Sequence, residues 1–381
     1  MHATALRVVI APDSFKGSIS ARDAAVAIAE GWRAAGPGDE LRLLPMADGG
    51  EGTIDTVAAA MPEAQRVPVE VLGPDGRPVR THWLRLPDGS ALVELAACSG
   101  LTLLPESRAS ARGSGPAAGD RQLRPRTAHS FGTGQAVRAA IEAGARRVFV
   151  ALGGSASSDG GAGMLAAMGA RLEDAEGRPI ALGNLGLDDL AAADLGGVAL
   201  PPEGLVAWTD VRSPLLGAAG SVAVFGPQKG LIDEEAEQAE RALERFAALI
   251  GGDPSTPGAG AAGGAGFALV RLGARMASGS SAVADAIGLP QAVAAAGLVI
   301  TGEGCFDEQS AQGKVVSLVS ALAEQSGART ALVAGAVRAD PRGFEAVVPL
   351  TALAAAGELH PMRDARELLR RAGGELARAC S

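Results

Sequence analysis

A series of short apolar runs, separated by alanine-rich segments with helical spacing, constrains the fold of this chain most. Runs this short, without polar alternation, are typical of strands buried on both faces of a parallel sheet. Segments such as 20–36 and 317–327 carry apolar residues at helical spacing. The alternation of strand and helix predicts an α/β class. The apolar runs lie at residues 6–11, 41–46, 147–153, 297–301, 330–335 and 344–350.

The length and the middle of the chain predict two domains. A chain of 381 residues exceeds one ordinary core, so two domains with a cleft are expected. GPDGRPV at 73–79 and LRLPDGSALVEL at 84–95 are typical of turns between alternating strands, which indicates a second sheet. Within this part, residues 233–252 predict a helix that Asp233 caps and that two glycines end.

Residues 106–126 have the composition of a flexible surface loop. Arg, Ser, Gly, Ala and Pro dominate this segment, and large apolar side chains are almost absent. Its arginines are compatible with a phosphate clamp, but the composition favours a solvated insertion. These arginines are Arg108, Arg112, Arg121, Arg124 and Arg126.

Composition argues against several classes of protein. The net charge is −9, aromatic residues make up 3% and tyrosine is absent, which disfavours a nucleic-acid surface of basic stripes and stacking rings. The three cysteines are far apart, so neither a disulfide framework nor a zinc site is indicated. No apolar stretch approaches the ~18 residues of a membrane span. The apolar run at the start of the chain is too short for a signal peptide. We therefore expect a cytoplasmic enzyme without nucleic-acid or membrane partners.

Polar and charged residues follow three of the apolar runs. In a doubly wound sheet, ligands bind at the carboxyl ends of parallel strands, because the loops there face one crevice. If these strands share a sheet, Lys16, Asp48, Glu51, Glu303 and Asp307 converge on one edge. The three segments are APDSFKGSIS with Asp13, Ser14 and Lys16, MADGGEGT with Asp48, Gly49, Gly50 and Glu51, and TGEGCFDEQS with Glu303 and Asp307.

These residue types suit phosphoryl transfer. A lysine beside glycine amides supplies positive charge for a phosphate, and clustered carboxylates hold Mg²⁺ or take a proton from an alcohol. Each element alone also has a structural interpretation, since Asp48 could cap the following helix and Lys16 could be a solvated side chain. Three such loops at the same edge favour a functional site.

GGSASSDGGAGM, residues 153–164, follows an apolar run and precedes an alanine-rich helical segment. Its amide and hydroxyl donors could cradle phosphate oxygens, with Asp159 available for a metal or a ribose. A tight turn with positive φ would explain the glycines but not so many hydroxyls, so the binding interpretation is preferred. The candidates are Gly153, Gly154, Ser155, Ser157 and Asp159.

Three further segments carry weaker signals. FGPQKG places Lys229 between glycines, and TDVRSPL places Asp210 beside Arg212. Both suit anion binding and both could be ordinary loops, so the choice stays open. GAGAAG at 258–263 satisfies GxGxxG but does not follow an apolar strand, which favours a glycine hinge or a nucleotide-site loop over a dinucleotide fingerprint.

Six ordered motifs resemble the bacterial glycerate kinase family of type 1 over nearly the whole chain. The resemblance implies ATP-dependent and Mg²⁺-dependent phosphorylation of D-glycerate, usually at the 2-hydroxyl. It also implies a flavodoxin-like (Rossmann-like) parallel-sheet domain made from both chain ends, 1–66 plus 290–381, with strands near 6, 41, 298, 330 and 346 in one sheet. A second α/β domain, 67–289, is inserted between them. The motifs are APDSFKGSIS, ADGGEGT, GGSASSDGGAGM, FGPQKG, GAGAAGG and VITGEGCFDEQSAQGK.

The resemblance leads to a set of expected roles. Lys16 and Lys229 neutralise the phosphates or the glycerate carboxylate. Glu303 and Asp307 bind Mg²⁺ directly or through water, and either Asp48 or Asp210 orients the attacking hydroxyl.

Two alternatives stay open at this point. One is a kinase of another small hydroxy acid, because SFGTG at 130–134 and AWTDVRSP at 207–214 depart from the usual family residues. The other is a non-catalytic nucleotide or metabolite sensor of the same fold. The oligomeric state, monomer or homodimer, is also left open.

Overall fold

The structure is a computed structural model that describes residues 5–15, 17–106, 121–308, 315–357 and 359–380. The chain forms two compact units. Unit 1 comprises residues 1–48, 55–61 and 280–381, and unit 2 comprises residues 49–54 and 62–279. The domain boundaries expected from the sequence, 66/67 and 289/290, stay a prediction.

Unit 1 is built on a five-stranded sheet in which all paired strands are parallel. The order β13-β12-β11-β1-β2 is the flavodoxin-like doubly wound order, with strands from both ends of the chain side by side. The prediction that the runs near 6, 41, 298, 330 and 346 share one sheet is confirmed. The strands are β1 (Arg7–Pro12), β2 (Glu40–Leu43), β11 (Leu298–Phe306), β12 (Arg329–Val337) and β13 (Ala346–Pro349).

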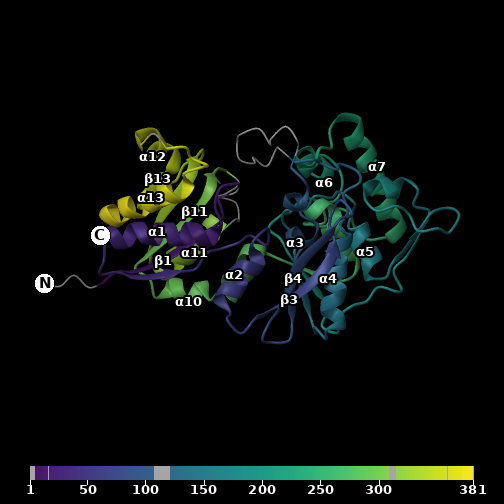
Figure 1. Cartoon of the computed structure of the whole chain (residues 1–381), viewed down its shortest axis with the longest axis horizontal. Coiled ribbons are helices and arrows are strands. Elements are labelled where there is room, and N and C mark those ends of the chain that lie inside the picture. Colours follow the sequence, from purple (N-terminus) through teal and green to yellow (C-terminus); the bar gives the residue numbers. More distant parts are fainter. Residues whose placement is uncertain (1–4, 16, 107–120, 309–314, 358, 381) are drawn as a thin grey trace. The chain divides into compact units, whose positions relative to one another are not determined.

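Helices cover both faces of this sheet, as Figure 1 shows. On one face, buried side chains such as Ile10 pack with those of α1 and α13. On the other face, Leu332 packs with Val316 of α11. Gly31 and Gly373 let α1 and α13 approach closely, because a Cβ at either position would overlap the backbone of the other helix. The helices are α1 (Ala21–Ala35), α9 (Gly279–Ala286), α10 (Leu289–Ala294), α11 (Val315–Ser326), α12 (Leu350–Gly357) and α13 (Ala365–Cys380).

The strand β11 is longer than the sequence predicts. The expected strand ends at residue 301 with a charged loop after it, but β11 continues to Phe306 and pairs with β12 throughout. Gly302 on β11 and Gly335 on β12 allow this, because a Cβ on either residue would overlap the backbone of the other strand. Glu303 therefore lies inside a strand, opposite Ala334.

Unit 2 contains a mixed six-stranded sheet in the order β10-β9-β6-β5-β4-β3. β5, β6, β9 and β10 run parallel, whereas β3 and β4 are added as antiparallel strands around the predicted turns. The strands are β3 (Gln65–Leu72), β4 (Pro78–Arg85), β5 (Ala91–Glu94), β6 (Val148–Ala151), β9 (Leu205–Trp208) and β10 (Arg275–Ala277). β7 (Arg171–Glu173) and β8 (Ala192–Asp194) form a separate antiparallel pair.

The helices of unit 2 surround a core that includes Leu243, Phe246 and Ile250 of α7. Asp233 does not cap α7, contrary to the sequence prediction. Ile232 holds the cap position, and Asp233 is the first helical residue with a φ of +47°. The helices are α3 (Leu95–Ser99), α4 (Phe131–Glu142), α5 (Ala162–Met168), α6 (Ser221–Phe225), α7 (Asp233–Ile250) and α8 (Ala265–Arg271), and α2 (Thr53–Ala60) begins in unit 2 and ends in unit 1.

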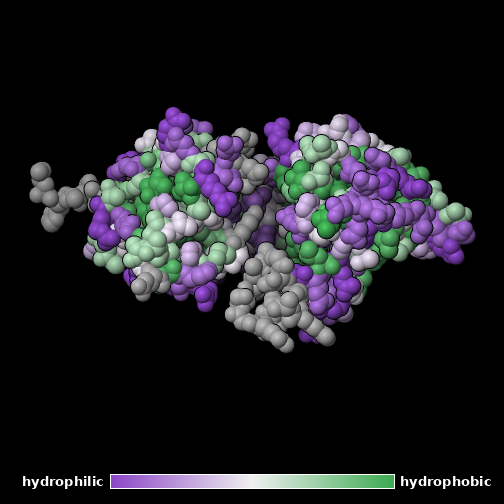
Figure 2. Space-filling view, turned by 90° about the horizontal axis from the view of Figure 1, so that it is seen from above, coloured by the Kyte–Doolittle hydropathy of each residue, from purple (hydrophilic) through white to green (hydrophobic). Residues whose placement is uncertain are grey.

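The surface of each unit mixes hydrophilic and hydrophobic residues on the face shown in Figure 2. In the described part of the chain, no helix is both long enough and apolar enough to cross a membrane. Most of the loop predicted at 106–126, including Arg108 and Arg112, lies outside the described residues. Its flexibility therefore stays a prediction.

Candidate active site

In unit 1, acidic residues gather at the carboxyl edge of the sheet, where β1 lies between β11 and β2. The Asp13 N–H donates to the carbonyl of Gly302, the residue before Glu303, at 2.8 Å. The chain after β2 stays hydrogen-bonded to β1 as far as Met46, two residues before Asp48. Asp13, Asp48 and Glu303 are all half-buried. This edge is where ligands bind in doubly wound folds.

Five residues were predicted to converge at this edge. Asp48, Glu303 and Asp307 all lie there, with Asp307 half-buried and directly after β11. Glu51 is exposed and belongs to unit 2. Lys16 lies outside the described residues, so its place in the site stays a prediction.

The loop after β1 is anchored by a buried aromatic ring. Phe15 is 2% exposed, and its N–H donates to the Ile19 carbonyl at 3.0 Å. The neighbouring Ser14 is half-buried, and its N–H donates to Asp13 Oδ1 at 2.6 Å. The core therefore holds one side of this loop at the edge of the sheet.

In unit 2, the glycines of the ADGGEGT motif pack directly on the first glycine of GGSASSDGG. The Gly153 N–H donates to Gly49 O at 3.0 Å, and a Cβ on Gly153 would overlap the backbone of Gly50. The Leu152 N–H donates to Trp208 O at 3.0 Å. Gly49 has a φ of +86°, and a Cβ there would lie 2.9 Å from the same Trp208 oxygen. Glycine is therefore required at both positions, and two motifs meet at the carboxyl ends of β6 and β9.

Glu94, which sequence analysis did not single out, holds the ADGGEGT segment through two hydrogen bonds. Its side chain is 5% exposed at the end of β5, and its carboxylate accepts hydrogen bonds from the N–H groups of Gly52 at 3.1 Å and Ile54 at 2.9 Å. These donors form the beginning of α2, where a carboxylate is favoured by the helix dipole. A Glu inside the apolar run ALVELA was the available sequence signal, because buried charges need partners.

Asp159 holds the GGSASSDGG loop to two helices. It is fully buried, and its Oδ2 accepts from the Ser130 N–H and the Ser130 hydroxyl, both at 2.8 Å, and from the Gly163 N–H at 3.2 Å. Its Oδ1 accepts from the Gly161 N–H at 3.1 Å. The carboxylate thus joins the starts of α4 and α5. In this arrangement Asp159 positions the loop, and its predicted contact with a metal or ribose stays a prediction.

Lys229 lies beneath the same loop. It is 2% exposed, and its Nζ donates to Ser155 Oγ at 2.7 Å and to Ser157 O at 2.6 Å. The hydroxyls of Ser157 and Ser158 are buried and have no hydrogen-bond partner among the described residues. Within 153–160 only Gly154 is exposed and Gly153 half-buried. A bound phosphate would therefore meet the backbone at Gly154, because the Gly153 N–H already donates to Gly49 O. Direct contact with Lys229 or the serine hydroxyls would require the loop to open.

The glycine-rich segment 258–264 supports the loop from behind. The Gly160 N–H donates to Gly263 O at 2.9 Å, and a Cβ on Gly263 would overlap the carbonyl of Ser157. The segment also holds the strand end after β9, because the Gly260 N–H donates to Ser213 O at 2.9 Å. This agrees with a loop that serves the site and not with a dinucleotide fingerprint.

Asp210 sits at the end of β9, beside Arg212. It is half-buried, and its Oδ1 accepts a hydrogen bond from the Ser278 hydroxyl, just after β10, at 2.8 Å. Arg212 is exposed. The carboxylate of Asp210 is therefore held in place near the meeting point of the two glycine motifs at Trp208.

Asn184 is a further support that sequence analysis missed, and Arg126 of the predicted loop holds it. Asn184 is fully buried and donates through Nδ2 to Ser158 O at 3.0 Å. Arg126 donates through Nε to Asn184 Oδ1 at 3.0 Å and pairs with Asp188 at 2.7 Å. Arg121 likewise donates to carbonyl oxygens of its own unit. These two arginines are internal supports, which does not favour the phosphate-clamp interpretation for them.

Comparison with known proteins identifies the family. The model of the glycerate kinase family matches residues 8–381, which is nearly the entire chain. The chain belongs to the glycerate kinase family. The predicted resemblance is confirmed, and with it the prediction that the chain is an enzyme of the kinase class.

Named relatives of this glycerate kinase family member include bacterial enzymes. The glycerate kinase of Bacillus subtilis (strain 168) is 38% identical over 344 residues, covering 88% of this chain and 86% of that protein. The glycerate 2-kinase of Escherichia coli (strain K12) is 39% identical over 329 residues, covering 84% and 82%. A solved structure from Salmonella typhimurium LT2, assigned as a glycerate kinase 2, has a TM-score of 0.78 and 38% identity and covers 99% of this chain and 98% of that chain.

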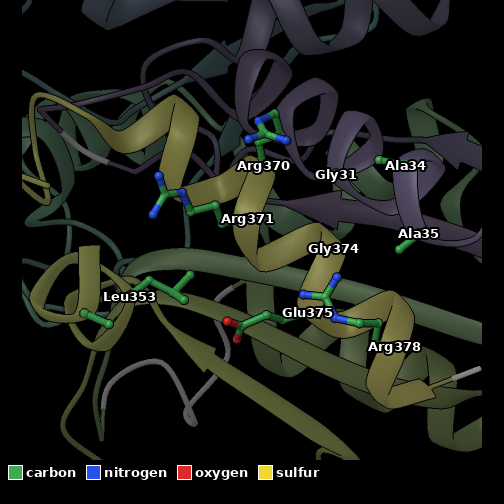
Figure 3. Close-up of a pocket in the computed structure, with 10 residues that line it drawn as sticks. Gly31, Ala34, Ala35, Leu353, Arg370, Arg371, Gly374, Glu375 and Arg378 are labelled. Atoms are coloured by element: carbon green, nitrogen blue, oxygen red, sulfur yellow. The ribbon is translucent and has the colours of Figure 1, made fainter. Parts of the chain in front are cut away.

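A hollow in unit 1 of this kinase lies away from the candidate site. It has a volume of about 560 Å³ and is bordered by small residues of α1 and by Arg370, Arg371 and Arg378 of α13 (Figure 3). Arg370 and Arg371 both pair with Glu367. The hollow reaches Ala35 at the end of α1, and a helix that follows a parallel strand ends near the amino ends of the strands. It is therefore at the edge opposite to the one where ligands bind.

The buried amine of Lys229 is expected to titrate near neutral pH. Burial lowers the pKa of Lys229 from 10.5 to about 7, an effect that the nearby Asp159 carboxylate partly opposes. The sequence has three lysines, Lys16, Lys229 and Lys314, so ¹³Cε-lysine labelling gives three NMR signals. We expect the signal that disappears in Lys229→Met to shift with a midpoint near pH 7. A midpoint near 10.5 for that signal would contradict the buried position of the amine.

The lowered pKa of Lys229 also makes stability depend on pH. Between pH 7 and 10.5 the unfolded chain holds one more proton than the folded chain, so the free energy of unfolding rises with pH, by at most about 1.4 kcal/mol per pH unit. Below pH 7 both states are charged, and the cost of burying the charge is fully present. Urea unfolding at pH 6, 7.5 and 9 should show wild type gaining stability relative to Lys229→Met as pH rises. If the free energies of unfolding of wild type and Lys229→Met change with pH in parallel, the lowered pKa of Lys229 is wrong.

Proposed function

We propose that this chain transfers the γ-phosphoryl group of ATP to D-glycerate and that the product is 2-phosphoglycerate. The observation that carries this proposal is the direct packing of ADGGEGT on GGSASSDGG at the ends of β6 and β9, in a chain of the glycerate kinase family. The exposed backbone of Gly154, just after β6, suits phosphate oxygens. The relative from Escherichia coli, which is named a glycerate 2-kinase, supports the choice of the 2-hydroxyl.

The phosphate groups are assigned to the backbone around Gly153 and Gly154, with Gly49, Gly50 and Glu51 beside them. Gly154 is exposed with a φ of +74°, a conformation that turns successive amides toward one side. Lys229 and Asp159 hold this loop in its shape from the interior. Because the transferred group is metaphosphate-like, positioning and charge neutralisation matter more than a strong base.

Two carboxylates are candidates for orienting the attacking hydroxyl. Asp210 is held by Ser278 at the end of β9, and Asp48 lies at the edge of the sheet in unit 1. Asp13 and Ser14 at the same edge supply further polar contacts for the substrate, and Lys16 supplies positive charge in this proposal. The kcat values of Asp48→Asn and Asp210→Asn identify the orienting carboxylate, because its replacement should lower kcat more.

The carboxylates of unit 1 fit a magnesium ion that arrives with ATP. Among the described residues, no three His, Cys, Asp or Glu side chains lie close enough to hold a metal alone. Mg²⁺ commonly uses one or two carboxylates together with substrate phosphates, so this donor set suits it. Glu303 and Asp307 are four residues apart along an extended segment, roughly 13 Å, which favours one direct ligand and one through water. When bound, the ion would neutralise phosphate charge.

The test is ³¹P NMR of the purified protein with MgATP and D-glycerate. A 2-phosphoglycerate signal is expected. A 3-phosphoglycerate signal would keep the enzyme activity and correct the assigned hydroxyl. If ATP stays intact and no phosphoester of glycerate forms, the substrate assignment is wrong, and a panel of other small hydroxy acids follows.

A further inference from the structure

Unit 2 contains a second pocket that sequence analysis did not anticipate. It has a volume of about 300 Å³ and lies beside α5. Its wall is mainly apolar, with Arg171 and Glu173 as the charged members. The other lining residues are Phe131, Ala162, Gly163, Ala166, Ala170, Leu172 and residues 179–183.

Three segments of the pocket wall contain, or are next in sequence to, residues that hydrogen-bond to the GGSASSDGG loop. Gly163, in the wall, donates its N–H to Asp159. Phe131 directly follows Ser130, whose N–H and hydroxyl also bind Asp159. Residue 183 directly precedes Asn184, whose amide donates to Ser158 O. Three separate segments of the wall are thus fixed to the loop that we assign to phosphate.

The chemistry of the wall suits a flat aromatic base and not a small anion. Phe131 is half-buried, and its ring is held edge-to-face by His129, with centroids 6.4 Å apart and planes at 88°. Apolar pockets from about 300 Å³ upward with a few polar groups are typical small-molecule sites, and aromatic rings stack on nucleobases. A carboxylate such as glycerate would lose its hydration against Leu172 and Ala166, and Arg171 already pairs with Asp194 at 2.6 Å.

We propose that this pocket binds the adenine base of the nucleotide substrate, with the phosphates directed to Gly153 and Gly154. The inference rests on the proposed function in taking ATP as the phosphoryl donor. It assigns a nucleoside subsite to unit 2, so nucleoside binding and phosphoryl transfer can be tested separately.

The test is a substitution that fills the pocket with a larger side chain. Ala166 is half-buried on α5, so Ala166→Leu places extra carbon atoms in the pocket without entering the core. Adenosine binding, followed by saturation-transfer NMR and calorimetry, should weaken about 10-fold or more, and the KM for ATP should rise similarly. The KM for glycerate and the binding of tripolyphosphate should stay unchanged.

Two further variants keep the result interpretable. Ala34→Leu is the matched control, because Ala34 is exposed and lines the hollow of unit 1 shown in Figure 3. It should bind adenosine like wild type. Phe131→Leu keeps an apolar side chain but removes the ring, and should weaken adenosine binding about 5-fold or more even if Ala166→Leu does not fold.

The outcomes separate the two proposals. If wild type does not bind adenosine, or if folded Ala166→Leu and Phe131→Leu bind it like wild type, the adenine subsite is wrong. If the variants lose adenosine while wild type forms no phosphoester from glycerate, the subsite stands and the proposed function fails.

Discussion

Replacing Gly153 by Ala is expected to lower kcat/KM for glycerate phosphorylation by about 100-fold while the protein stays folded. The added Cβ would overlap the backbone of Gly50, so the two glycine motifs must move apart. Such overpacking costs about 1–3 kcal/mol, which a protein of this size survives, whereas displacement of about 1 Å in a positioned site is costly for catalysis. Steady-state kinetics with circular dichroism and thermal unfolding check both parts.

Gly38→Ala is the matched control for this substitution. A Cβ on Gly38 would meet nothing within 4 Å, so the variant should keep the kinetics of wild type. If Gly153→Ala has normal kcat/KM, the contact between residues 49–50 and 153 does not position the reaction. The role that we assign to the packed glycines would then be wrong.

Asp159→Ala is expected to lower the free energy of unfolding by on the order of 3–5 kcal/mol. The carboxylate is fully buried and accepts four hydrogen bonds, from Ser130, Gly161 and Gly163. Removing it leaves buried donors without partners at the starts of α4 and α5 and leaves the amine of Lys229 without its nearby counter-charge. Urea unfolding followed by tryptophan fluorescence reports this loss, since Trp83 and Trp208 lie in unit 2 and Trp32 in unit 1.

Asp174→Ala serves as the comparison. Asp174 also accepts three hydrogen bonds, from the N–H groups of Glu176 and Arg178 and from the Arg178 side chain. Its turn is at the surface, where water can replace the lost acceptor, so the loss of stability should be much smaller. Equal losses in the two variants would show that burial of the Asp159 network contributes little.

Gly153→Ala and Asp159→Ala test how the loop 153–160 is positioned more than they test direct contact with substrate. The exposed part of 153–160 is only the backbone around Gly153 and Gly154. The charged residues Asp159 and Lys229 lie beneath it and hold its shape. A loop supported in this way presents amide groups at low entropic cost, which is what a reaction that depends on positioning requires.

Much of the fold was predictable because its signals are local. The apolar runs near 6, 41, 298, 330 and 346 became the five strands of unit 1. The turns at 73–79 and 84–95 became the connections of β3, β4 and β5. Length, spacing and turn residues express these features within a few positions of the chain.

Other features depend on partners that are distant in the sequence. The extension of β11 to Phe306 required β12 beside it and glycines that let the strands approach. Asp233 is a residue type that commonly caps helices, but Ile232 holds the N-cap position of α7. The support of the ADGGEGT segment by Glu94 links residues 40 positions apart. None of these partners is visible in a local pattern.

The sequence by itself determined the α/β class, the family and the loops where the candidate chemistry lies, because periodicity and motifs are properties of neighbouring residues. The tertiary structure decided which motif residues reach the surface. Lys229 and Asp159 are residue types that often bind ligands, yet both side chains are buried. The loop 153–164 packs against α4, α5 and the segment 258–264, which keeps these side chains in the interior. Burial is set by contacts between segments far apart along the chain, so the division between binding and supporting residues could be found only in the folded protein.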